Sequence, residues 1–114
     1  MSLRMRKSPA SPLPPPCALT ECMSLIAGAW TPNVIWHLGG GPRRFGELRA
    51  DLPRISARVL SARLKALEAR GVVHRRAAPT SPPSVEYSLT EVGRELVPAL
   101  HAIVEVGARL KRLR

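Results

Sequence analysis

The feature that most constrains the fold is an uninterrupted amphipathic segment at residues 57–70, which contains neither glycine nor proline. Ser56, directly before it, has a side chain suited to capping a helix N-terminus, and Gly71, directly after it, is suited to ending a helix. Apolar residues recur inside the segment at intervals of three and four, namely Val59, Leu60, Leu64 and Leu67. The pattern predicts one helix that buries one face and exposes the other.

Three shorter helices are predicted before this segment. Residues 18–29 have the apolar spacing of a first helix. Thr31 followed by Pro32 favours a second helix with Thr31 as its N-cap, and the glycines of residues 39–41 are expected to end it. Residues 45–52 repeat their apolar side chains at helical spacing and are followed by proline, which is typical of a short helix that stops there.

Strands and a final helix complete the expected order of elements. A short strand is expected at residues 43–45, and the sequences at 72–77 and 85–89 are typical of two strands joined as a hairpin. Thr90 is suited to capping a last helix over residues 91–113. A short helix, a turn, a longer helix and a hairpin are the elements of a winged helix-turn-helix. We therefore expect a mainly α fold with a small β-hairpin, a winged helix-turn-helix with an added C-terminal dimerisation helix.

The positive charge of the chain is concentrated over these elements. The chain has 18 Lys and Arg against 8 Asp and Glu, a formal net charge of +10. Residues 43–76 hold ten of the cations against three acids, which leaves +7 in this block. So basic a chain favours a polyanionic partner, with nucleic acid as the first candidate and an anionic membrane as the second. No apolar run approaches the ~20 residues of a membrane span, so no membrane is expected as a partner.

The candidate DNA contacts follow from the position of the long helix, because the second helix of such a unit enters the major groove. At about 100° per residue, Arg58, Ser61 and Lys65 fall opposite the apolar face. Arg63 lies on the flank, where it is equally suited to a phosphate or to an ion pair with an acid such as Asp51. The predicted DNA-binding residues are Arg43, Arg44, Ser56, Arg58, Ser61, Arg63, Lys65, Arg75 and Arg76.

The last predicted helix carries more apolar surface than a small monomer is expected to leave exposed. A helical stripe of apolar side chains runs along it, and we predict that this stripe forms a homodimer interface with the first helix packed against it. The predicted interface residues are Leu96, Leu100, Ile103 and Leu110.

Three stretches of the chain carry a resemblance to a known family. They are LIAGAW at 25–30, GPRRFGELRADLPRISARVLSARLKALEARGVV at 41–73 and PPSVEYSLTEVGREL at 82–96. The chain resembles the HxlR-type winged-helix transcriptional regulators, which are related to MarR-like regulators, from Cys17 to about residue 110. The resemblance implies a bacterial regulator that binds double-stranded operator DNA as a homodimer.

The resemblance also implies a role for Cys17. Members of the family often have a cysteine at the start of the domain, and in some of them it senses oxidants or electrophiles. Cys17 occupies that position, so an oxidant or small-molecule effector is expected to act there. Cys22 is expected to be a buried thiol. Residues 1–16 are expected to form a flexible, basic, proline-rich tail before a domain of residues 17–114, and since they lack the apolar region of a signal peptide, we expect a cytoplasmic protein.

Two other function classes were weighed. A general basic nucleic-acid binder of chromatin or RNA, without an effector, is the first alternative, but the few aromatic residues are not interleaved with arginine as a base-stacking platform requires. An enzyme is not expected, because none of the three histidines lies near a nucleophile or metal ligand in the sequence and no glycine-rich phosphate loop precedes a helix. Catalytic residues, a metal site and cofactors are accordingly not expected.

Overall fold

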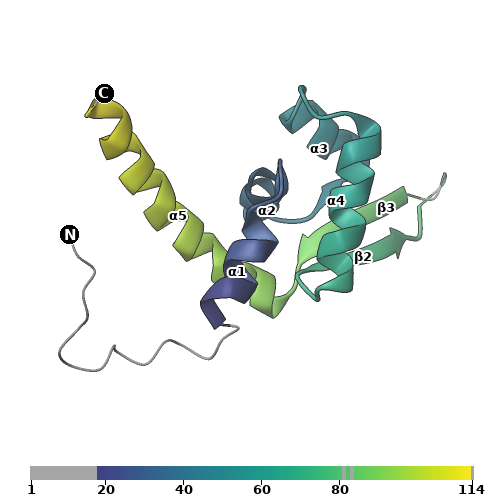
Figure 1. Ribbon diagram of the computed structural model, residues 1–114. Helices are drawn as coiled ribbons and strands as arrows, with labels where there is room; N and C mark the ends of the chain where they lie inside the picture. The colour runs from purple at the N-terminus through teal and green to yellow at the C-terminus, as the bar shows by residue number, and fades with distance from the viewer. Residues whose placement is uncertain (1–17, 81, 83, 114) are drawn as a thin grey trace.

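The computed structural model describes residues 18–80, 82 and 84–113 (Figure 1). The predicted tail and Cys17 lie outside these residues. In chain order the elements are α1 (Ala18–Ile26), α2 (Thr31–Leu38), β1 (Arg43–Arg44), α3 (Phe45–Asp51), α4 (Ala57–Ala69), β2 (Val73–Ala78), β3 (Ser84–Leu89) and α5 (Glu91–Arg112). The molecule is mostly helical with one small antiparallel sheet, as predicted, and no helix within the described ranges has the length and apolarity that crossing a bilayer requires.

The core lies where α2, α3 and α4 meet one another and the sheet. Its largest fully buried side chains come from α2, from α3, from the turn before α4, and from α4, namely Val34, Ile35, Leu48, Ile55, Leu60, Leu64 and Leu67. The apolar face predicted for the long helix is therefore the face that α4 buries. In Figure 1 the hairpin of β2 and β3 lies beside α4, whereas α5 leaves the sheet and extends away from the other helices.

The sheet contains the predicted hairpin and, as its third strand, the short strand expected at residues 43–45, which covers Arg43–Arg44. Its order is β1-β3-β2, with both pairs antiparallel, so the central strand is β3. The two residues of β1 come directly before α3 and pair with the middle of β3. The helix-turn-helix and the wing are thus joined through main-chain hydrogen bonds as well as through the chain itself.

Two of the three predicted helix caps are confirmed. The Ser56 hydroxyl accepts a hydrogen bond from Val59 N at 3.1 Å, and the Thr90 hydroxyl accepts one from Gly93 N at 3.0 Å. The third was wrong, because α2 begins at Thr31 itself and Trp30 precedes it with a left-handed φ of 71° and no side-chain cap. The first helix also ends at Ile26, three residues earlier than predicted.

The start of α5 is fixed tightly to the rest of the fold. The Thr90 hydroxyl donates to the Gly71 carbonyl at 2.7 Å, where α4 gives way to β2. Gly93, in the first turn of α5, is buried, and a Cβ built on it would lie 2.3 Å from the carbonyl oxygen of Val72. Only a residue without a side chain allows this approach of the helix to the turn before β2.

Candidate nucleic-acid interface

The outer side of α4 matches the predicted polar face. Arg58 and Lys65 are exposed, as are the small residues Ala62 and Ala69 between and beyond them. Ser61 is half-buried, because it faces the hairpin. Small residues next to long cationic ones allow a helix backbone to approach a groove floor while the cations reach phosphates or base edges.

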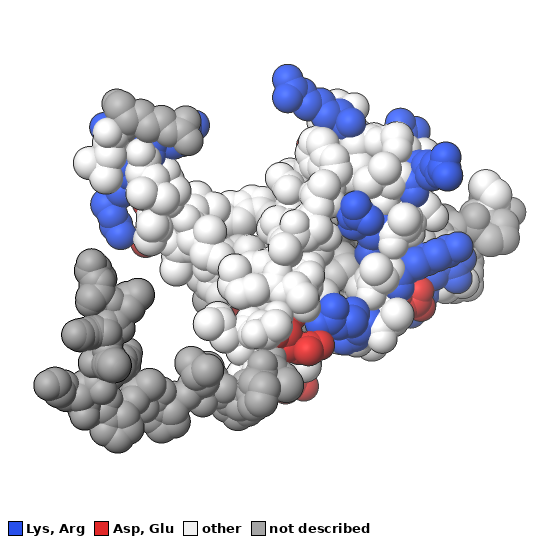
Figure 2. Space-filling model, viewed as in Figure 1, with Lys and Arg blue, Asp and Glu red and all other residues white. Residues whose placement is uncertain are grey.

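Lys and Arg side chains gather on one side of the molecule. Figure 2 shows them over α3, α4 and the hairpin, whereas the hollow side between α2 and α5 is mostly uncharged. A second, smaller group lies near the end of α5, whose last turn contains Arg109, Lys111 and Arg112. The electrostatic surface suited to a polyanion therefore coincides with the helix-turn-helix and the wing.

Arg43, one of the predicted phosphate contacts, has a partner within the protein. Its guanidinium donates to both carboxylate oxygens of Asp51, with donor–acceptor distances of 2.8, 2.9 and 3.0 Å. This bidentate ion pair joins β1 to the end of α3. The acid that was considered for Arg63 is thus paired with Arg43 instead.

Arg63 also points away from the outer face. Its Nε donates to the carbonyl oxygen of Ala29 at 2.7 Å, in the link between α1 and α2. Arg63 therefore contacts a main-chain carbonyl and not Asp51, the acid that was considered for it. Arg44 keeps an exposed side chain, while its backbone N–H donates to Glu47 at 2.8 Å at the start of α3.

The strand register determines which way Arg75 faces. Arg75 and Arg43 lie opposite Tyr87 from its two sides, so these three residues share one face of the sheet. Val73, two residues before Arg75 and on the same face, is buried. This face is turned toward α4, and a polar hollow of about 330 Å³ separates them, lined by Ser61, Lys65, Glu68, Arg75 and Tyr87.

Arg76 faces the other side of the sheet. It lies opposite Glu86, and Arg44 lies opposite the same glutamate from the other edge. A carboxylate between two guanidinium groups offsets part of the positive charge on this face. The two adjacent arginines of the wing are therefore not equivalent, and Arg75 is the one that shares a surface with α4.

The residues predicted for the dimer interface fall into two groups. Leu100 is 5% exposed and belongs to the core of the protomer, and Leu96 is half-buried against that core. Ile103 and Leu110 are 51% and 57% exposed. Leu100 is thus buried against α2 within one chain, because α5 packs on α2 before it leaves the body. The exposed apolar surface of α5 and its C-cap also includes residues that were not selected for the interface, namely Val92, Val104, Val106 and Leu113.

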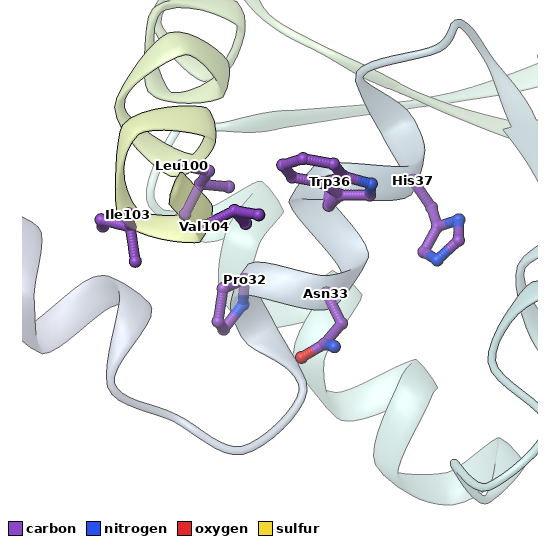
Figure 3. Close-up of a pocket in the computed structure, with 7 residues that line it drawn as sticks. All are labelled: Pro32, Asn33, Trp36, His37, Leu100, Ile103 and Val104. Carbon is purple, nitrogen blue, oxygen red and sulfur yellow. The ribbon is translucent and has the colours of Figure 1, made fainter. Parts of the chain in front are cut away.

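An apolar hollow of about 170 Å³ lies where α5 leaves α2 (Figure 3). Trp36 from α2 faces Leu100 and Val104 from α5 across it, whereas His37 points away. The Trp36 ring also stacks obliquely on His101, with ring centroids 4.4 Å apart. The apolar character of this hollow suits a hydrophobic side chain or a small apolar molecule, and it is continuous with exposed Ile103.

Cys22 differs from its prediction. Its thiol is exposed and forms no disulfide, whereas a buried thiol was expected. The reason is that α1 contains no buried residue, so no side of this helix offers an enclosed position.

Relatives of this chain are regulators that carry a helix-turn-helix. The HTH-type transcriptional regulator YdeP of Bacillus subtilis is 39% identical over 95 residues, covering 83% of this chain and 74% of the relative. The HTH-type transcriptional regulator YvaP of the same organism is 42% identical over 83 residues, covering 73% and 77%.

Solved structures of two regulators share the fold. The redox regulator HypR in its reduced form matches with a TM-score of 0.78 and 38% identity, covering 83% of this chain and 94% of that chain. The reduced form of the transcriptional regulator YodB from B. subtilis matches with a TM-score of 0.72 and 34% identity, covering 76% and 85%. The family model described as HxlR-like helix-turn-helix matches residues 25–113, so the chain belongs to this family of transcriptional regulators.

Proposed function

We propose that the protein binds double-stranded operator DNA sequence-specifically, as a cytoplasmic homodimer that regulates transcription and does not act by catalysis. The observation that carries the proposal is the single surface formed by α4 and the wing. Arg58 and Lys65 are exposed on the outer side of α4, and Arg75 lies across the polar hollow from Lys65. Cations on a helix face and on the adjacent wing suit simultaneous contact with base edges and with the phosphate backbone.

Two copies are needed for the specificity of such a surface. One recognition helix reads only a few base pairs, whereas a two-fold dimer places two of them in successive major grooves ~34–36 Å apart. We propose that the dimer forms through the exposed apolar side of α5, which includes Ile103 and Leu110. Leu96 and Leu100 support this surface from within the protomer.

The role of α4 is tested by Arg58→Ala. We expect it to weaken binding to a selected operator by about 1–3 kcal/mol and to relax the base preference at one position, because Arg58 lies in the first turn of α4 on its outer side. The measurement is selection of bound sequences from random duplex DNA, followed by titration of the best site.

Arg75→Ala is the matched control, since it removes an arginine from the wing rather than from α4. It should weaken all duplexes alike and reduce the salt slope by about one unit, as the loss of a phosphate contact does. An equal loss of affinity on every sequence for Arg58→Ala would show that Arg58, like Arg75, contacts phosphate rather than a base. Equal affinity of the wild type for selected duplex, scrambled duplex and single-stranded RNA would instead favour a general nucleic-acid binder.

We also propose that Cys17 receives the signal. It precedes α1, where the positive end of a helix dipole favours a thiolate. Similar solved structures include HypR in its oxidized form and YodB in quinone-bound and diamide-treated forms. An oxidant or electrophile of comparable reactivity is therefore the proposed effector.

The exposed thiol of Cys22 makes a second variant necessary. Diamide should change the operator affinity of the wild type and of Cys22→Ser by at least several-fold, and should leave Cys17→Ser unchanged. Titration of operator DNA before and after treatment measures this. A response that disappears in Cys22→Ser but persists in Cys17→Ser would move the sensor to Cys22, and equal responses in all three proteins would exclude both cysteines.

A further inference from the structure

Helix α1 has few attachments to the rest of the protomer. None of its nine residues is buried, and Leu25 is the residue of α1 that packs partly buried against the core. On the exposed part of the helix, Leu19 and Met23 are 61% and 50% exposed. Since burial of apolar surface is the main force that holds a helix in place, polar contacts must contribute a large share of the placement of α1.

Arg63 of α4 and Arg70, the C-cap residue of α4, supply these polar contacts. Arg70 donates to the Glu21 carboxylate at 2.7 Å and to the Glu21 carbonyl at 3.3 Å. Arg63 donates to the carbonyl of Ala29, just after α1, at 2.7 Å. The two arginines are seven residues apart and therefore lie on the same side of α4, one above the other.

The arginines span a gap rather than reinforce close packing. A hollow of about 240 Å³ lies between α1 and α4, and both guanidinium-bearing side chains line it together with Ser24, Leu25, Gly28, Thr31, Ala66 and Leu67. At about 100° per residue, Arg63 and Arg70 are turned about 120–160° away from Arg58 and Lys65 around the helix. They therefore face α1 while the outer side of α4 remains free for DNA.

We propose that Arg63 and Arg70 are positioning residues that fix the recognition helix against α1, so that α1 links the dimer interface to the DNA-binding surface. This inference rests on the proposed function. On one side α1 is held by the arginines of α4, and on the other it presents Leu19 and Met23 to a second copy. A change in how the two copies pack displaces α1, and the two arginines transfer that displacement to α4.

The contribution of the two arginines differs. The Glu21 side chain is 65% exposed, so solvent screens its ion pair with Arg70 strongly. Arg63 is half-buried, and its bond to a main-chain carbonyl lies directly at the link between α1 and α2. Substitution of Arg63 is therefore expected to have the larger effect.

Arg63→Lys separates positioning from direct DNA contact. Lysine keeps the charge but lacks the Nε donor and the planar group that reaches Ala29, whereas it serves well as a phosphate ligand. We expect operator affinity to fall at least ~5-fold with an unchanged salt slope, while Arg109→Lys on α5 has no effect. Arg63→Lys with wild-type affinity would overturn the proposal.

Glu21→Arg gives an independent test, because an electrostatic role and a positioning role of this region predict opposite changes in DNA affinity. It adds positive charge, so a purely electrostatic role of this region predicts tighter DNA binding. Loss of the contact with Arg70 predicts weaker binding instead, and combining Glu21→Arg with Arg70→Glu should restore it, because the reversed pair has the same net charge as the wild type. Tighter binding by Glu21→Arg alone would overturn the proposal.

Amide hydrogen exchange on the free protein tests whether the arginines hold α1 in place. It uses no DNA, so its result does not depend on the proposed function. Arg63→Lys should speed exchange in α1 and in residues 27–30 without lowering the thermal midpoint of the whole domain. A wild type that binds no duplex DNA would refute the proposed function, whereas the exchange still reports whether the arginines hold α1. Unchanged exchange in α1 would overturn the inference even if operator binding were established.

Discussion

Ile103→Glu is expected to convert the protein into a monomer and to reduce operator affinity by about 10²–10⁴-fold. Ile103 is half-exposed at the point where α5 leaves the body, next to the apolar hollow that Trp36 lines. A carboxylate at this position would be buried without a partner in the proposed dimer, which costs several kcal/mol. The loss of operator affinity is large because a dimer that binds two half-sites at once gains about this factor over a monomer that binds one.

Sedimentation velocity measures the assembly, and titration of a two-half-site duplex measures the affinity. Ala102→Glu is the matched control, because it adds the same charge one residue earlier, on the side of α5 away from Leu100 and Val104. The control should remain dimeric and bind normally. A dimer that persists in Ile103→Glu would place the interface on another surface.

Gly93→Ala is expected to lower the free energy of unfolding by about 2–3 kcal/mol, a large share of the stability of a small domain. The added Cβ meets the carbonyl oxygen of Val72 at 2.3 Å and the Leu89 side chain at 3.2 Å. Because the Val72 carbonyl is held by a hydrogen bond from Thr90 N at 3.0 Å, it cannot rotate away freely, and α5 must shift and strain the cap at Thr90. This cost exceeds the gain of about 1 kcal/mol that alanine otherwise brings to a helix interior.

Gly46→Ala in α3 is the control for Gly93→Ala, since a Cβ built there meets nothing within 4 Å. Its stability should be equal to that of the wild type or up to about 1 kcal/mol higher. Urea unfolding followed by circular dichroism measures both variants. Equal stability of the two variants would mean that α5 does not pack on Val72 and Leu89 as closely as this structure shows.

The parts of the fold that depend on neighbouring residues could be predicted from the sequence. The caps at Ser56 and Thr90 bond to residues three positions later, and the apolar face of α4 follows from its own spacing. These signals are local, so each can be recognised without knowledge of the tertiary structure. Together they were sufficient to predict the order of elements and the outer face of α4.

The parts that depend on pairing between distant segments could not be predicted. Residues 43–76 contain ten cations and few acids. No local pattern indicates that Asp51 forms its ion pair with Arg43, or that Glu21 forms its ion pair with Arg70. Leu100 and Ile103 have the same apolar character, but α2 covers only the first of them. Trp30 adopts a left-handed conformation that bulky residues rarely occupy, so no local signal indicated that Trp30, rather than Thr31, directly precedes α2.

The third strand of the sheet has a consequence for how such a protein is switched. Because β1 is hydrogen-bonded to β3 and leads directly into α3, the wing cannot bend away from the helix-turn-helix without breaking main-chain hydrogen bonds. The helix-turn-helix and the wing therefore form one unit with a fixed internal geometry. In the proposed dimer, a signal therefore acts through the distance and rotation between two such units, and the regulated quantity is the fit to half-site spacing rather than the affinity of each half.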